Sequence, residues 1–165
     1  MIRIVMVWLC CVLGTLHAVD VFYDAFHGLQ GRFVLQAEHH WDVQESFLGG
    51  VAVVSDSIGS MSYQMTAWEI SYRRYVQKTT RSGVFYSVGC RLGPLKLQQP
   101  EMEDESTHLL MPFYNIGIKA QFNKKWYHSM QLEVGYIIAY TDNINVDALI
   151  GLHVTPRFSF GYNLD

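Results

Sequence analysis

A histidine, a serine and a glutamate stand close together in one segment of the sequence, at His128, Ser129 and Glu133. These side-chain types supply the base, the nucleophile and the orienting acid of hydrolases that act through an activated serine. Adjacent side chains of a strand point to opposite faces, so His128 and Ser129 cannot readily form the hydrogen bond between base and nucleophile. The chemistry would need a spacing of two residues. We therefore predict a protein that is not an enzyme, with an enzyme that uses these three residues as a weaker alternative.

Two further groups of residues are of the types that bind metal ions. His39 and His40 are adjacent and diverge in the same way on a strand, and the sequence near them contains no other cluster of ligands. The acidic run at 101–105 lacks the spacing and the central glycine of a calcium-binding loop. The sequence has no glycine-rich phosphate loop, no serine elbow and no CxxC pair. We expect no metal site and no cofactor.

The segment around His128, Trp126–Tyr140, alternates with a period of two, which is a strand signal. The residues at every second position, which we call one parity, are mostly apolar or aromatic. The residues between them, the other parity, are polar or small except for Ile137. The segment is longer than an ordinary strand of about 5–6 residues, and longer than the roughly 9–11 residues with which a tilted strand crosses a bilayer. One apolar face, one polar face and aromatic residues near the ends are typical of a membrane β-barrel strand.

The rest of the chain repeats this pattern. Alternating segments predict eight strands, at 19–26, 31–41, 46–55, 61–77, 83–92, 109–122, 126–140 and 146–164. Short turns at 42–45, 78–82 and 123–125 alternate with loops at 56–60, 93–108 and 141–145, as in barrels with short periplasmic turns and longer outer loops. Pro156 is expected to mark a bulge or a strand corner. We predict an all-β fold, a single antiparallel up-and-down transmembrane β-barrel, with eight strands if 19–26 is one and seven otherwise.

The composition favours an exported β-protein. Charged residues make up 16% of the chain, against about 25% in a typical soluble domain, and a net charge of −3 without a basic stripe argues against nucleic acid. Residues 1–18 resemble a signal peptide, with Arg3, an apolar run at 4–13 and the small Ala18. The barrel domain then covers 19–165, in which Cys90 is the single cysteine and cannot form an intrachain disulfide. No later stretch has the 18 consecutive apolar residues of a membrane-spanning helix candidate.

The charged residues within the strands fall on the parity opposite to the apolar one. If the apolar parity faces lipid, the inward charges are Glu38, Glu69, Arg73, Arg91, Lys119, Glu133 and Arg157. An eight-stranded barrel is only wide enough for side chains to fill it, so we expect these charges to pair and to plug the lumen. Glu69 and Glu133 should each pair with a base such as Arg73, Arg91 or Lys119. In a water-soluble sandwich the apolar parity would instead form the core and the charges would be solvated.

Aromatic residues on the outward parity suit the boundary between lipid and water, where membrane barrels carry aromatic girdles. The residues expected there are Trp41, Trp68, Tyr72, Trp126, Tyr136, Tyr140 and Tyr162. Outer-membrane lipid is the partner that this surface implies.

Several segments also resemble small bacterial outer-membrane β-barrel proteins of the OmpX/OmpW type. The resemblance rests on GRFVLQAEHHWDVQESFLGG, on WEISYRRYVQKTTRSGVFYSVGCRLG, and on the strand endings IGIKAQF and FSFGYNL. It implies the outer membrane of a Gram-negative cell, insertion by the barrel-assembly machinery, and a structural or surface-interaction role with host or environmental ligands at the outer loops. The alternatives are a small porin-like channel for hydrophobic solutes and, less strongly favoured, a lipid A-modifying enzyme, as some outer-membrane barrels are, or a soluble periplasmic β-domain.

Overall fold

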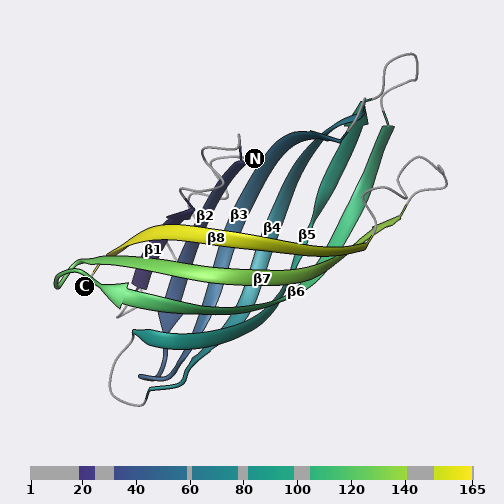
Figure 1. Ribbon diagram of the computed structural model, residues 1–165. Helices are drawn as coiled ribbons and strands as arrows, with labels where there is room; N and C mark the ends of the chain where they lie inside the picture. Colours follow the sequence, from purple (N-terminus) through teal and green to yellow (C-terminus); the bar gives the residue numbers. More distant parts are fainter. Residues whose placement is uncertain are drawn as a thin grey trace.

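Eight antiparallel strands close into a barrel in the computed structural model, which describes residues 19–24, 32–58, 61–77, 82–98, 105–140 and 151–164 (Figure 1). Each strand pairs with its neighbours in chain order, and β1 pairs with β8. The predicted all-β, eight-stranded up-and-down barrel is confirmed. The strands are β1 Val19–Asp24, β2 Arg32–His40, β3 Glu45–Ile58, β4 Met61–Tyr75, β5 Gly83–Gln98, β6 Glu105–Gln121, β7 Trp126–Tyr140 and β8 Gly151–Asn163.

The short β1 closes the barrel. Asp20 lies opposite Glu38 of β2 on one side and opposite Asn163 of β8 on the other. The segment therefore counts as a strand, although 25 and 26 lie outside the described residues. None of the described residues form a helix that is long and apolar enough to cross a membrane.

The loop predicted at 93–108 is wrong in its bounds. β5 continues to Gln98 and β6 begins at Glu105, so strand structure occupies both sides of the expected loop, and Leu97 lies opposite Glu105. Pro94 does not end the strand. It interrupts only the ladder between β5 and β4, while the register between β5 and β6 runs through Pro94 and His108 without a break. Because proline lacks an N–H group, it disturbs the ladder on one side of a strand only.

Two other local expectations also fail. The loop expected at 56–60 is shorter, because β3 continues to Ile58. Pro156 marks no bulge, since β7 and β8 pair residue for residue from Trp126↔Tyr162 to Ile137↔Gly151. The described pairing of β8 with β1 ends at Ser159, so Pro156 lies beyond it and removes no donor from that ladder. The expectations for 78–81 and 141–150 fall outside the described residues.

The interior of the barrel changes character along its length. The end with the short turns, at the lower left of Figure 1, encloses the charged side chains. The other end, where β3–β6 rise to the upper right, encloses an apolar core, and Ile137 packs against it. That contact explains the one large apolar residue on the polar parity of β7. The core residues are Leu95, Leu97, Leu109, Met111 and Phe113, with Tyr63, Met65 and Ile137 packed against them.

The outer surface changes in the opposite sense. Outward side chains near the middle of the barrel are large, apolar and exposed, such as Trp68 at 55% and Ile70 at 59% of full exposure. Past Trp68 on β4, Leu92 on β5 and Leu110 on β6, the outward residues become polar or small. These are Ser62, Gln64 and Thr66 on β4, Pro94, Lys96 and Gln98 on β5, and Ser106 and His108 on β6, all exposed. We call the apolar surface between this limit and the short turns the apolar belt. Charges inside and apolar residues outside contradict the sandwich alternative, which required the reverse.

Candidate functional site

All seven predicted inward charges are buried inside the barrel. With partners that the sequence did not single out, they form two groups. The lower cluster, near the short turns, consists of Asp20, Glu38, His40, Arg73, Tyr75 and Lys119. The middle cluster consists of Asp24, Glu69, Arg91, Glu133 and Arg157.

Glu38 on β2 is the centre of the lower cluster. Its Oε1 accepts hydrogen bonds from Ser46 Oγ at 2.6 Å and from the Tyr75 hydroxyl at 2.8 Å. Its Oε2 accepts from Arg73 Nη1 at 3.1 Å and from Lys119 Nζ at 2.9 Å. A buried carboxylate is tolerated when cations and hydrogen-bond donors surround it. Four donors from three other strands meet that requirement.

Lys119 on β6 reaches across the lumen to the same group. Its Nζ lies 2.5 Å from Asp20 Oδ2 and 2.9 Å from Glu38 Oε2. The rings of Phe22 and Tyr127 have their centroids 4.9 Å and 4.6 Å from the ammonium nitrogen. Two carboxylates and two aromatic faces therefore replace the water that this ammonium loses on burial.

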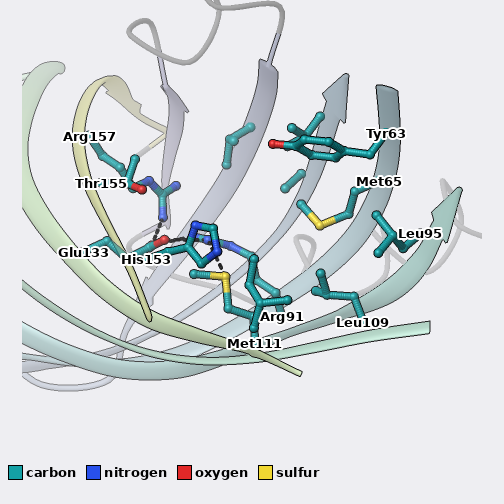
Figure 2. Close-up of a pocket in the computed structure, with 14 residues that line it drawn as sticks. Tyr63, Met65, Arg91, Leu95, Leu109, Met111, Glu133, His153, Thr155 and Arg157 are labelled. Carbon is teal, nitrogen blue, oxygen red and sulfur yellow. Dashed lines mark hydrogen bonds and ion pairs between the residues drawn. The ribbon is translucent and has the colours of Figure 1, made fainter. Parts of the chain in front are cut away.

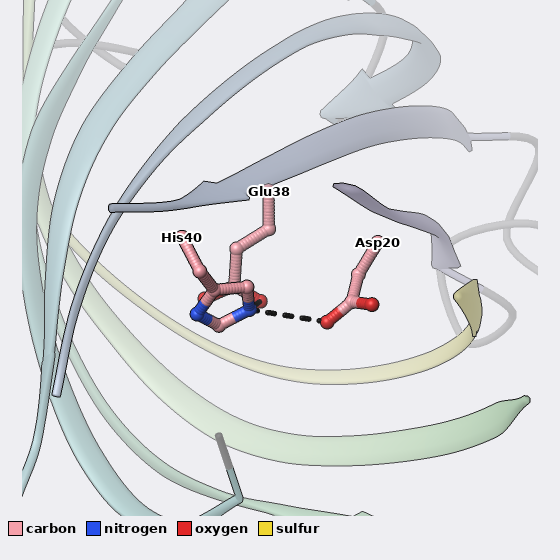
Figure 3. A group of neighbouring side chains, drawn as sticks. All are labelled: Asp20, Glu38 and His40. Carbon is pink, nitrogen blue, oxygen red and sulfur yellow. Dashed lines mark hydrogen bonds and ion pairs between the residues drawn. The ribbon is translucent and has the colours of Figure 1, made fainter. Parts of the chain in front are cut away.

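Asp20, Glu38 and His40 form a potential metal-binding group (Figure 3). Their ligand atoms lie within 4.8 Å of one another, so the expectation of no ligand cluster around His40 was wrong. The sequence near His40 does not predict this cluster, because Asp20 belongs to a different strand. His40 Nε2 lies 3.1 Å from Asp20 Oδ2, and Lys119 Nζ lies 3.5 Å from the same nitrogen. The lysine ammonium thus serves as the cation of this group, and a metal ion would have to displace it.

The middle cluster joins β1, β4, β5, β7 and β8. Arg91 donates from Nε to Glu69 at 2.7 Å and from both terminal nitrogens to Glu133. Arg157 donates from Nε to Asp24 at 2.9 Å and from Nη1 to Glu133 at 3.0 Å, with Glu69 at 3.5 Å. Glu69 and Glu133 thus share Arg91 and Arg157. Arg73 and Lys119, the other bases proposed for them, lie in the lower cluster instead.

Aromatic rings and glycines support the inward arginines. Arg73 lies over the Phe85 ring at 4.0 Å, and Arg91 lies over the Phe113 ring at 4.8 Å. Phe85 itself covers Gly117, where an added Cβ would come within 2.8 Å of the ring. Because Gly117 has no side chain, the Phe85 ring has room to pack against Arg73.

Several partners of these charges were not predicted from the sequence. They share the inward parity of residues that were identified, since Gln36 and His40 alternate with Glu38 along β2. Asp20 and Asp24 show the same alternation in the short β1. The parity rule applied to every polar residue, not only to charges within the long strands, would have found all four.

A cavity of about 90 Å³ lies above the middle cluster, toward the long hairpins (Figure 2). Arg91, Glu133 and Arg157 form its charged floor. Its wall is mostly apolar and comes from β2 to β8. The wall residues are Val34, Ala52, Val54, Tyr63, Met65, Leu95, Leu109, Met111, Ile137, His153 and Thr155.

The structure of this chain, but not its sequence, is similar to that of a known protein. No protein-family model matches the sequence, and no curated protein matches it. Among solved structures, the chain is similar to the crystal structure of Neisserial surface protein A (NspA), with 11% sequence identity and a TM-score of 0.52 over 88% of this chain and 93% of that one. The chain has the fold of a small outer-membrane β-barrel. At this identity the likeness concerns the fold alone, and at that level it confirms the resemblance drawn from the sequence.

The aromatic residues expected at a lipid boundary form contacts near the short turns. Trp41 packs against Phe47 and Tyr72, with ring centroids 4.3 Å and 5.9 Å away. Trp126 and Tyr162, on neighbouring strands, meet edge to face at 4.9 Å.

Two more of these aromatic residues lie elsewhere on the outer surface. Trp68 lies outward at the limit of the apolar belt on β4, and Tyr136 lies outward on β7. The side chain of Tyr140 lies outside the described residues.

The three residues considered for hydrolytic chemistry lie on two faces of β7. Ser129 and Glu133 are buried in the lumen, where Glu133 belongs to the middle cluster. His128 points outward and contacts the Phe122 and Phe158 rings, with centroids 4.3 Å and 6.3 Å away. The base and the nucleophile therefore lie on opposite sides of the barrel wall.

Proposed function

We propose that this chain is an integral outer-membrane barrel without catalytic activity, whose lumen is plugged by paired charges and whose role is structural or surface interaction. The observation that carries the proposal is the sorting of side chains across one wall. Four bases and five carboxylates are buried inside in contact with one another, while the outward residues at the same heights are apolar and exposed. A lipid-facing barrel needs this sorting, since an outward Arg or Lys at the bilayer midplane costs about 2–4 kcal/mol.

The apolar belt sets the position of the barrel in the bilayer. Trp41, Tyr72, Trp126 and Tyr162 would lie at the periplasmic boundary, next to the short turns. Trp68 would lie at the outer boundary, because the next outward residues on its strand are polar. Interfacial tryptophans and tyrosines flank the apolar band of membrane barrels in the same way.

The charge clusters support a closed lumen. Eight strands leave an interior that side chains can fill. The middle cluster crosses the lumen, because Arg91 of β5 binds Glu133 of β7 while Arg157 of β8 binds Glu69 of β4. Below it, Lys119 of β6 and Asp20 of β1 make a second crossing. A solute would have to break both sets of buried ion pairs to pass.

The long hairpins support a role at the surface. β4, β5 and β6 continue past the apolar belt with polar or small residues outward and an apolar core inside. In this placement they project from the outer leaflet like the wall of a small soluble barrel. We propose that they meet host or environmental ligands, and that the barrel-assembly machinery inserts the chain.

Two measurements test this proposal. The barrel, folded in detergent, is run on a gel with and without boiling, and its fraction in the cell is determined. We expect a heat-dependent change in mobility and recovery with the outer membrane. In planar bilayers we expect no steady conductance. A protein in the periplasmic fraction without a mobility change would overturn the membrane placement, and steady open channels would overturn the plug.

One observation favours a second function, a small channel for hydrophobic solutes. The wall of the cavity at the outer end is mostly apolar, as a site for such solutes requires, but its volume of about 90 Å³ would have to increase to admit a molecule of the size of benzene. A solute that entered it would have to leave sideways into the membrane, since the middle cluster lies below. Deletion of the protein should then reduce the uptake of a hydrophobic solute, whereas the closed barrel predicts no change.

A further inference from the structure

A group of basic and hydrogen-bonding side chains lies on the outer face of the sheet, just past the limit of the apolar belt. It consists of Gln64 on β4, Lys96 on β5, and Ser106 and His108 on β6, all exposed. We call these four residues the outer basic patch. We propose that the patch binds the phosphate of a lipid headgroup in the outer leaflet. This proposal rests on the membrane placement proposed above.

The strand register brings the four residues together. Lys96 lies opposite Gln64 on one side and opposite Ser106 on the other. His108 lies opposite Pro94, two residues from Lys96 on β5, so it is the diagonal neighbour of Lys96. Diagonal neighbours on one face of a sheet lie about 7–8 Å apart, which long side chains can span. One phosphate can therefore contact both basic side chains.

The patch is suited to an anion. None of the outward residues that the structure describes past the belt on β4, β5 and β6 carries a carboxylate. Within the described part of the chain, no ion pair or side-chain hydrogen bond engages any of the four patch side chains. An ammonium group and several hydrogen-bond donors without a protein partner are complementary to a phosphate group.

The other boundary of the belt carries outward charges of both signs. There Arg74 pairs with Glu45 at 3.8 Å, and both Asp42 and Lys124 are exposed in the short turns. A phosphate near Arg74 would compete with a carboxylate that is already in place. We therefore assign the phosphate to the outer leaflet and not to the periplasmic one.

The patch lies at the height of the headgroups. Leu92 is the last apolar outward residue of β5 before the polar ones, and Lys96 follows about 13 Å further along the strand. A strand tilt of about 35–45° reduces this to about 10 Å along the membrane normal, and places His108 at about 5 Å. The headgroup layer on each side of the hydrocarbon core is roughly 5–7 Å thick. His108 thus lies within this layer, and the flexible Lys96 side chain can bend back into it.

Exposed lysines also serve simply to keep a surface in water, and the two roles make different predictions. A lysine that is only solvated can be replaced by glutamine without any change in lipid binding. A lysine that binds phosphate loses affinity on that change and keeps it when replaced by arginine. Lys124 is the matched control, because it is exposed in a short turn at the opposite end of the barrel.

The test measures lipid binding to the barrel in dodecyl maltoside micelles by native mass spectrometry. The probes are dioctanoyl phosphatidic acid and dioctanoylglycerol, which has the same tails but no phosphate. We expect the barrel to bind phosphatidic acid at least tenfold more tightly. The double change Lys96→Gln and His108→Gln should weaken this binding at least fivefold, since one basic residue near a membrane surface contributes about fivefold. Lys96→Arg and Lys124→Gln should each leave it within about twofold. The heat-dependent gel shift establishes that each variant has folded.

Three results would overturn the proposal. The first is a phosphatidic acid affinity that the double glutamine variant keeps. The second is an equal loss in Lys124→Gln, which would mean a general attraction of anionic lipid to the barrel. The third is full competition by inorganic phosphate at the concentration of the lipid, which would assign the patch to free phosphate. Each would leave the membrane placement intact, because that placement is tested separately by the cell fraction and the gel shift.

Discussion

Lys119 of β6 and Asp20 of β1 form a buried ion pair across the lumen, with 2.5 Å between Nζ and Oδ2. The two residues are 99 positions apart in the sequence, and their strands are not neighbours in the sheet. Asp20 also contacts His40 of β2 and accepts a hydrogen bond from Asn163 of β8. The pair therefore holds the short first strand against three other strands, in addition to the backbone ladders that close the barrel.

Loss of the lysine charge should destabilise the barrel strongly. Lys119→Met keeps most of the side-chain length but leaves Asp20 and Glu38 with one cation fewer in a buried site. Removing one partner of a buried ion pair costs about 3–5 kcal/mol. We expect a loss of that size in the free energy of unfolding, measured by urea titration of the barrel in lipid vesicles. Lys124→Met, in an exposed turn, should change it by less than about 0.5 kcal/mol. Equal effects of the two changes would mean that Lys119 is not buried among carboxylates.

The two kinds of ion pair in this barrel should differ in strength. Glu69 is buried between Arg91 and Arg157, whereas Glu45 pairs with Arg74 at 3.8 Å on the surface, where the two side chains are 31% and 48% exposed. Glu69→Gln should cost about 3–5 kcal/mol, because two guanidinium groups lose a charged partner in a buried site. Glu45→Gln should cost less than about 1 kcal/mol. The measurement is the same urea titration, and a cost for Glu69→Gln no larger than that for Glu45→Gln would show that water reaches the middle cluster.

The sequence was most informative where one wall of the barrel separates two unlike environments. In Trp126–Tyr140 the alternation reveals both the strand and the direction of its side chains, because Glu133 and Leu132 tolerate only one side each. It failed where β5 and β6 leave the apolar belt. There Leu95 and Leu97 point inward and Lys96 points outward. Apolar residues face the interior and polar residues face outward, the reverse of the arrangement within the belt, so the sequence pattern predicted a loop.

The ion-pair partners illustrate a different limit. Parity places Glu38 and Lys119 on the same inner surface, yet it says nothing about their height along the barrel axis. That height depends on the stagger of all the strands between them, which the sequence does not encode locally. The prediction identified Arg91 correctly as a partner of Glu69 and Glu133. It also offered Lys119 to these two carboxylates, because parity does not show that Lys119 lies at the height of Asp20 and Glu38. The cluster around His40 was missed for the same reason.

The inward glycines should be intolerant of even one added methyl group. At Gly161 of β8, a Cβ would come within 2.4 Å of the Phe22 ring, which itself lies over the Lys119 ammonium. Gly161→Ala should therefore cost about 1–3 kcal/mol, as overpacking of a filled interior does. Gly49 on β3 faces outward and has no atom within 4 Å of an added Cβ, so Gly49→Ala should not destabilise the barrel. Urea titration of both variants distinguishes them, and equal stability would mean that Phe22 moves without loss.

The outer limit of the apolar belt can be located with a single strand. Ile116 and His108 lie on β6 with the same outward parity, but Ile116 lies within the belt and His108 lies past its limit. If lipid covers the belt, Ile116→Arg should lower the free energy of unfolding in vesicles by about 2–4 kcal/mol. His108→Arg should change it by less than about 0.5 kcal/mol, because its side chain lies in water.

The same pair of variants separates the membrane barrel from a soluble one. In a soluble barrel both side chains would point into water, and both arginines would be tolerated equally. In a membrane that covered the whole length of β6, both would be costly. A large cost at Ile116 combined with none at His108 is expected only when the bilayer ends between them.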